Sequence, residues 1–178
     1  SRSHDLAEPF TFLYSGVLGM KHNPDLLLQL ALHWKENPRV RVAVISEGPG
    51  ADWLQQKKAD HGLDNLVLLN FQAHADLPFA LASADVLVAL LEADAGVFSV
   101  PSKVLTYLCT GRPLLLAVPP ENLAARIVAQ HGAGLVVSPL DGEGLFCASE
   151  TLYRDAGLRD RFAQNGRAYA LAQFDIQK

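Results

Sequence analysis

The residues best suited to chemistry lie where an apolar segment at 86–91 gives way to a helical pattern that begins near residue 102. Proline and serine favour a helix start, where unpaired backbone N–H groups attract anions such as phosphate. A lysine in the first helical turn opposes the helix dipole, which favours a role in binding an anion. The alternative is an ordinary helix cap with a solvated lysine. The candidate anion-binding residues at this helix start are Pro101, Ser102 and Lys103.

A second candidate for anion binding follows the apolar segment 10–16. Gly16 and Gly19 allow a ligand to approach the backbone, and Lys21 supplies a positive charge just before a predicted helix. The alternative is a turn with a solvated lysine. The segment lacks the G-x-G-x-x-G pattern of dinucleotide-binding proteins, and the chain has no Walker A motif, so neither class of nucleotide site is indicated.

Three further residues could contact a nucleoside. Phe71 and Gln72 end an apolar segment, and a flat ring beside an amide suits a nucleobase, although a core phenylalanine with a surface glutamine fits equally well. Thr106 follows Lys103 by three residues and shares its face of the predicted helix. Its hydroxyl would reach a ligand hydroxyl or face the core.

The sequence lacks the residue patterns of several other kinds of functional site. The six histidines show no metal-binding spacing, and Glu92 and Asp94, although spaced as a carboxylate pair, precede a glycine-containing loop. We therefore expect no metal and no cofactor. Cys109 and Cys147 lie far apart in sequence, no G-x-S-x-G motif occurs, and a net charge of −4 without a basic patch argues against nucleic-acid binding. No apolar run is long enough for a membrane span, and we expect a cytoplasmic protein.

The chain alternates apolar segments with helical patterns. The apolar segments are almost continuous in Val, Leu and Ile, which is typical of parallel strands covered by helices on both sides. We expect one α/β domain over residues 9–178, a Rossmann-like three-layer α/β/α sandwich with a six-stranded parallel sheet, after a linker or cloning remnant at 1–8. Ligands of such sheets bind beyond the carboxyl ends of the strands. The predicted strands are 10–16, 40–46, 66–71, 86–91, 113–118 and 135–137, and the predicted helices are 25–35, 53–61, 77–83, 102–110, 123–131, 144–155 and 158–172.

Residues 100–115, which read VPSKVLTYLCTGRPLL, resemble the donor-binding stretch of retaining GT-B glycosyltransferases. The resemblance is greatest to the large family-four group, in its variant with Pro-Ser-Lys, a tyrosine and a Gly-basic-Pro sequence. It covers residues 10–174 and matches only the C-terminal half of the family. Supporting segments occur in the family's order at 12–19, 47–49, 62–71, 134–137 and 165–169.

The resemblance implies a domain that binds a UDP- or GDP-linked sugar without a metal. Backbone amides from Ser99 to Ser102 would hold the diphosphate, and Lys21 would match the family's basic residue after the first strand. The chain departs from the family at three places. Val17 replaces a usual arginine, while Thr106 and Phe98 replace two usual glutamates. Lys103 would then supply the missing positive charge.

The resemblance also implies transfer of a hexose or hexosamine to a glycan or lipid-linked acceptor, in polysaccharide or envelope glycan synthesis. The acceptor would be bound by an N-terminal domain outside this chain, so this chain alone is expected to be inactive. Peripheral association with the inner face of the membrane would occur through that other half. The alternative is a non-catalytic binding or scaffold module that has lost the donor-binding carboxylates.

Overall fold

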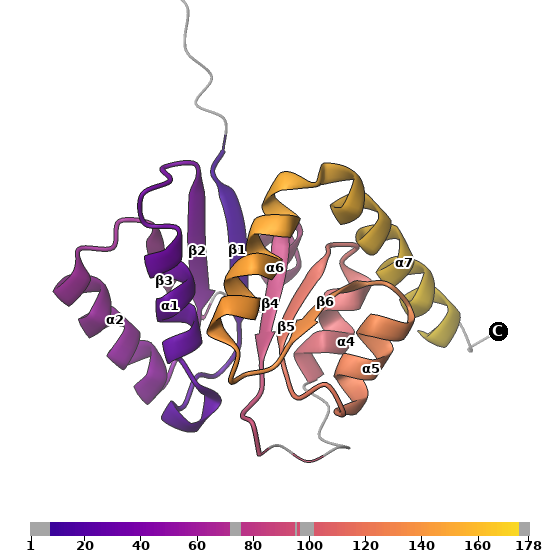
Figure 1. Cartoon of the computed structure of the whole chain (residues 1–178), viewed down its shortest axis with the longest axis horizontal. Helices are drawn as coiled ribbons and strands as arrows, with labels where there is room; N and C mark the ends of the chain where they lie inside the picture. The colour runs from indigo at the N-terminus through magenta and orange to yellow at the C-terminus, as the bar shows by residue number, and fades with distance from the viewer. Residues whose placement is uncertain (1–7, 72–75, 95, 97–101, 175–178) are drawn as a thin grey trace, which may run out of the picture.

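The computed structural model describes residues 8–71, 76–94, 96 and 102–174. Six parallel strands form one sheet in the order β3-β2-β1-β4-β5-β6, with helices on both faces (Figure 1). This confirms the predicted Rossmann-like α/β/α fold. The strands are β1 (Phe10–Ser15), β2 (Val40–Ile45), β3 (Leu66–Leu69), β4 (Val86–Leu90), β5 (Leu114–Ala117) and β6 (Gly134–Val137).

The helices follow the strands in regular alternation. They are η1 (Met20–His22), α1 (Asp25–His33), α2 (Pro49–His61), α3 (Leu77–Ser83), α4 (Ser102–Cys109), α5 (Leu123–Gln130), α6 (Gly142–Arg154) and α7 (Ala156–Phe174).

Most limits agree with the sequence prediction to within two residues, and α2 is the largest exception. It begins at Pro49 instead of residue 53, because Gly48 turns the chain with φ 112° and proline then occupies the first helical turn. The short 3-10 helix η1 was not predicted. It contains Lys21 and places His22 beside the loop that follows β1.

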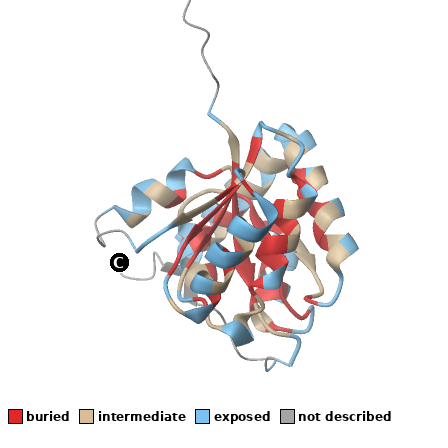
Figure 2. Ribbon diagram, turned by 90° about the vertical axis from the view of Figure 1, so that its left-hand side faces the viewer, coloured by how far each residue is buried: buried red, intermediate tan, exposed pale blue. Residues whose placement is uncertain are grey.

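Alternate residues of each strand enter two separate cores. Phe12 and Val42 pack on the face covered by α1, α2 and α6, whereas Leu13 and Ala43 pack on the face covered by α3, α4 and α5. Helix α7 reaches both cores, because Phe162 packs against the first and Ala170 against the second. Figure 2 shows the buried sheet between helices whose outer surfaces are exposed. Burial on both faces explains the nearly continuous apolar strands.

The strand order reverses between β1 and β4. These two strands are neighbours in the sheet, although β2 and β3 lie between them in the sequence. From β1 the chain continues to β2 on one side, whereas from β4 it continues to β5 on the other side. In Figure 1 both strands run downward, and the segments that follow them lie together at the lower edge. In an open parallel sheet this is where a ligand crevice forms.

Candidate functional site

A cavity of about 480 Å³ opens at the carboxyl ends of β1 and β4. Its wall is polar on the side of β1 and apolar on the side of α3. This volume lies within the range of small-molecule sites. The lining residues are Tyr14, Ser15, Gly16, Val17, His22, Phe71, Leu77, Leu81, Leu90, Leu91, Lys103, Thr106 and Tyr107.

Lys103 is the cation of this cavity. It projects from the first turn of α4 across the end of β1, where its Nζ donates a hydrogen bond of 2.7 Å to the Tyr14 hydroxyl. The same nitrogen lies 4.1 Å from the centroid of the Tyr14 ring. Among the described residues no carboxylate forms an ion pair with Lys103. Within the described part of the chain, its contacts are with the neutral side chain of Tyr14, so its charge is suited to binding an anion.

Burial affects the protonation of Lys103. Desolvation lowers the pKa of its ammonium group from 10.5 to about 8. The group is still mainly protonated at pH 7, but the fold holds a poorly solvated positive charge. A bound phosphate would relieve that cost, because it would replace lost water with an opposite charge.

Gly16 provides the space for the lysine head group. Its φ is +148°, a conformation that side chains rarely adopt, and a Cβ built on it would lie 2.6 Å from Lys103 Nζ. The loop is also tied to its neighbour, since Ser46 Oγ donates a 2.5 Å hydrogen bond to the carbonyl of Gly16. The glycine therefore lets the ammonium group lie directly against backbone.

A buried tyrosine joins the three elements around the crevice. The Tyr107 hydroxyl on α4 accepts a 3.0 Å hydrogen bond from the backbone N–H of Ser15 and donates one of 3.1 Å to the carbonyl of Val88. Burial raises the pKa of Tyr107, so the phenol stays neutral and keeps its donor. These bonds fix the ends of β1 and β4 against α4.

Of the residues predicted from sequence, Gly16, Phe71, Lys103 and Thr106 are brought together around the cavity. Lys21 lies nearby in η1 but does not line the cavity, whereas its neighbour His22 does. Ser102 begins α4 as predicted. The binding roles of all these residues stay predictions. Four candidates lie outside the described residues, namely Gln72, Ser99, Val100 and Pro101, and so does Phe98.

Sequence reasoning gave no role to Tyr14 or Tyr107. Both occur in otherwise apolar segments, and both rings are buried, with 1% exposure each. A buried phenol needs a hydrogen-bond partner for its hydroxyl, so a tyrosine in an apolar segment indicates a polar contact at that point of the core. Neither segment indicates by itself that both hydroxyls end at the same crevice.

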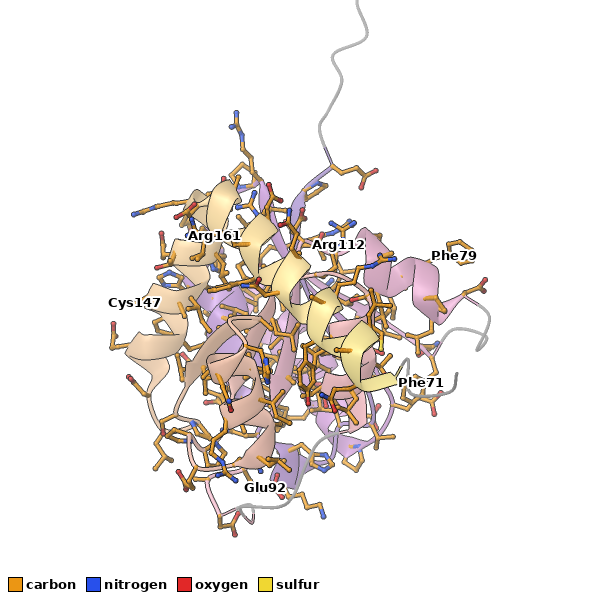
Figure 3. All side chains as sticks on the ribbon, turned by 90° about the vertical axis from the view of Figure 1, so that its right-hand side faces the viewer. Phe71, Phe79, Glu92, Arg112, Cys147 and Arg161 are labelled. Carbon is orange, nitrogen blue, oxygen red and sulfur yellow. The ribbon has the colours of Figure 1, made fainter. Side chains whose placement is uncertain are left out.

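The other wall of the cavity is apolar. Leu81 and Leu90 are buried, while Phe71 at the rim is 40% exposed. Phe79, on the same helix as Leu81, projects outward and is labelled with Phe71 in Figure 3. A flat, half-exposed ring at the rim of a cavity suits a ligand with a planar group.

No acidic side chain lines this cavity among the residues that the structure describes. Glu47 and Asp52 belong to a neighbouring hollow of about 500 Å³ beyond β2. Glu92 lies at the lower edge in Figure 3.

Within the described ranges, no three His, Cys, Asp or Glu side chains gather to hold a metal ion, and both cysteines are free and exposed. None of the described helices is long and apolar enough to cross a membrane.

Comparisons with known proteins agree on the family and the fold. The family model "Glycosyl transferases group 1" matches residues 2–169. No curated protein matches the chain in sequence.

Solved structures with this fold include three from bacteria. The C-terminal domain of the group 1 glycosyltransferase LpcC from Francisella tularensis is 19% identical, with a TM-score of 0.72 over 96% of this chain and 89% of that one. HepE from Anabaena in complex with UDP is 21% identical, with a TM-score of 0.77 over 95% and 46%. The catalytic domain of cholesterol-α-glucosyltransferase from Helicobacter pylori is 17% identical, with a TM-score of 0.76 over 93% and 99%.

The match covers less than half of HepE but most of the LpcC domain. This chain therefore corresponds in extent to a part of a longer protein such as HepE. The family model spans nearly the whole chain, and the sheet with its helices has the fold found in these structures. The chain thus belongs to the group 1 glycosyltransferases of the GT-B family-four type and has the fold of their C-terminal domain.

Proposed function

We propose that the crevice between β1 and β4 binds the diphosphate of a nucleotide-linked sugar. The observation that carries the proposal is Lys103, a largely desolvated ammonium group without an anionic partner among the described residues, at the start of a helix. Negative charge develops on the leaving diphosphate during sugar transfer, and a lysine and a helix start stabilise it electrostatically. The chain needs no metal for this step.

Other residues that line the cavity suit the base and the ribose of the nucleotide. The half-exposed ring of Phe71 suits the base, and the hydroxyl of Thr106 suits the ribose. UDP is bound in the Anabaena structure, which supports uridine diphosphate as the first ligand to test, with guanosine diphosphate as the alternative. We propose transfer of a hexose or hexosamine to a glycan or lipid-linked acceptor, in polysaccharide or envelope glycan synthesis.

The acceptor would be bound by an N-terminal domain across the crevice. HepE, a protein of this fold, is about twice as long as this chain. In this proposal the present chain binds the donor but does not complete the transfer alone. The assembled enzyme would act in the cytoplasm, with any contact to the inner membrane surface made by the other half.

Calorimetry with UDP and GDP at pH 7.5 tests donor binding. We expect the chain to bind one of the two, and Lys103→Ala to weaken binding by roughly tenfold to a hundredfold, because it removes the ammonium group from the cavity. Lys57→Ala is the matched control, since Lys57 lies over the Trp53 ring on α2, away from the cavity. Absence of binding to both nucleotides, or equal affinities of the two variants, would contradict the proposal.

A second candidate function is a non-catalytic binding module. It is favoured by one observation, the absence of a carboxylate from the described lining of the cavity, where Thr106 stands in place of the glutamate implied by the family resemblance. Sugar turnover by the full-length protein that is lost on Lys103→Ala would exclude it. Nucleotide binding without any turnover would favour it.

A further inference from the structure

The Tyr14 hydroxyl lies in a directed chain of hydrogen bonds. It donates to the carbonyl of Val17 at 3.2 Å and accepts from Lys103 Nζ at 2.7 Å. A phenol has a single proton, so when that proton points to Val17 only lone pairs remain for the lysine. The direction of the chain makes the lysine the donor, which favours its protonated form.

The packing of Tyr14 fixes where this hydroxyl lies. The ring is 1% exposed and belongs to the core beneath α1, α2 and α6, so it cannot turn away from the crevice. Lys103 arrives from α4 on the opposite face of the sheet. The ammonium group is held between the Tyr14 hydroxyl and Gly16, at the mouth of the crevice.

The surroundings of Lys103 set its charge. The titratable groups that line the cavity with it are Tyr14 of β1, His22 of η1 and Tyr107 of α4, and no described carboxylate joins them. Burial lowers the pKa of Lys103, and burial raises that of Tyr14, which therefore stays a neutral acceptor. The phenol oxygen and the face of its ring are the groups that offset the desolvation of the ammonium.

We propose that Tyr14 is a positioning residue, which holds the Lys103 ammonium at the crevice mouth and keeps it protonated for the incoming diphosphate. The inference deepens the donor-binding proposal and rests on it. It assigns a function to a side chain that would otherwise count only as part of the hydrophobic core.

Calorimetric titration with UDP, from pH 7.5 to 9.5, tests the inference on Tyr14→Phe. The variant keeps the ring and removes only the oxygen. We expect roughly fivefold weaker binding at pH 7.5, and a decline of affinity with pH that begins at least half a unit lower than in the wild type. Tyr153→Phe is the control, because Tyr153 packs on Phe10 and Trp34 outside the cavity.

A double-mutant cycle separates positioning from a general effect on the fold. In the Lys103→Ala background, Tyr14→Phe should change UDP affinity by less than about twofold, because the group that it positions is gone. An undiminished effect in that background would overturn the inference. So would a Tyr14→Phe variant whose affinity equals that of the wild type at every pH.

Failure of the donor-binding proposal can be recognised independently. The Lys103 side chain of the ligand-free protein can be titrated by NMR with ¹³C-labelled lysine. We expect the midpoint to fall by at least half a pH unit in Tyr14→Phe, whether or not UDP binds. An unchanged midpoint would overturn the role of Tyr14, whereas a lowered midpoint without UDP or GDP binding would leave that role intact and contradict the donor site.

Discussion

Charged side chains at the two ends of the sheet differ in how far other protein groups compensate their charge. At the amino end, a hollow of about 490 Å³ is lined by residues that include Lys35, Arg41 and Asn65. Lys35 Nζ donates to the carbonyl of His61 at 2.9 Å, and Arg41 Nε donates to Thr11 Oγ1 at 2.8 Å. These groups join neighbouring elements to one another, as is typical of polar side chains that stabilise a fold.

At the carboxyl end, Lys103 is bonded to a neutral phenol in a crevice where its solvation is poor. The two cavities are nearly equal in volume, so size does not distinguish them. The difference lies in how far protein groups already compensate the charge. A lysine that the fold leaves undercompensated is a better indicator of a ligand site than a cavity of a given volume.

The largest effect is expected for Gly16→Ala. Its Cβ would collide with Lys103 Nζ, and its φ of +148° is unfavourable for alanine. We expect UDP affinity to fall by roughly a hundredfold and the free energy of unfolding by about 1–3 kcal/mol. Calorimetry and urea unfolding measure the two. At Gly62 of the αL cap of α2, alanine meets no atom within 4 Å. Gly62→Ala should therefore keep full UDP affinity, and a Gly16→Ala protein with wild-type affinity would refute the crevice geometry.

Lys103→Met should stabilise the protein at pH 7 by on the order of 1 kcal/mol, because it removes a desolvated charge. Below pH 8 the folded protein bears the full cost of the buried ammonium. Between pH 8 and 10.5 the folded lysine is already neutral while the unfolded one is still charged, so the cost disappears as the pH rises. The advantage of the variant should therefore shrink across this window. Urea unfolding at pH 7, 9 and 10.5 measures it, and a destabilised variant at pH 7 would contradict this account.

The smallest effect is expected for Lys35→Met, the same substitution at the amino end. Lys35 is exposed and bonded to a backbone carbonyl, so its loss should cost a few tenths of a kcal/mol and leave UDP affinity unchanged. The sign is opposite to that at Lys103. Urea unfolding of both variants under one set of conditions compares them directly. If both substitutions stabilise the protein equally, the contrast between the two ends does not hold.

The fold could be predicted from sequence because its signals are local. Nearly continuous apolar strands, Pro24 before α1 and the Pro-Ser sequence at 101–102 all act within a few residues. The sequence predicts the start of α2 four residues too late, because the proline and glycine at residues 49 and 50 are typical of a turn. Here Gly48 turns the chain and Pro49 already occupies the first helical turn.

The site could be predicted only in part. Gly16 and Phe71 follow strands and Lys103 lies in the first turn of a helix, which are positions near a ligand in any open parallel sheet, and Thr106 lies one helical turn after Lys103. The sequence therefore predicts these four residues as neighbours, and all four line the cavity. The pairing of Lys103 with Tyr14 spans 89 residues of sequence and depends on β1 and β4 being neighbours. No local pattern encodes such a contact, and it emerges only once the strand order is known.

The Tyr107 hydroxyl has a consequence for the energetics of recognition. By binding Ser15 and Val88 at once, it sets the width of the crevice before any ligand arrives. Because the backbone at the ends of β1 and β4 is already ordered, little conformational entropy would be lost there when a nucleotide binds. Preorganisation of this kind should appear as slow amide hydrogen exchange at Ser15 in the empty protein, with little further slowing when UDP binds.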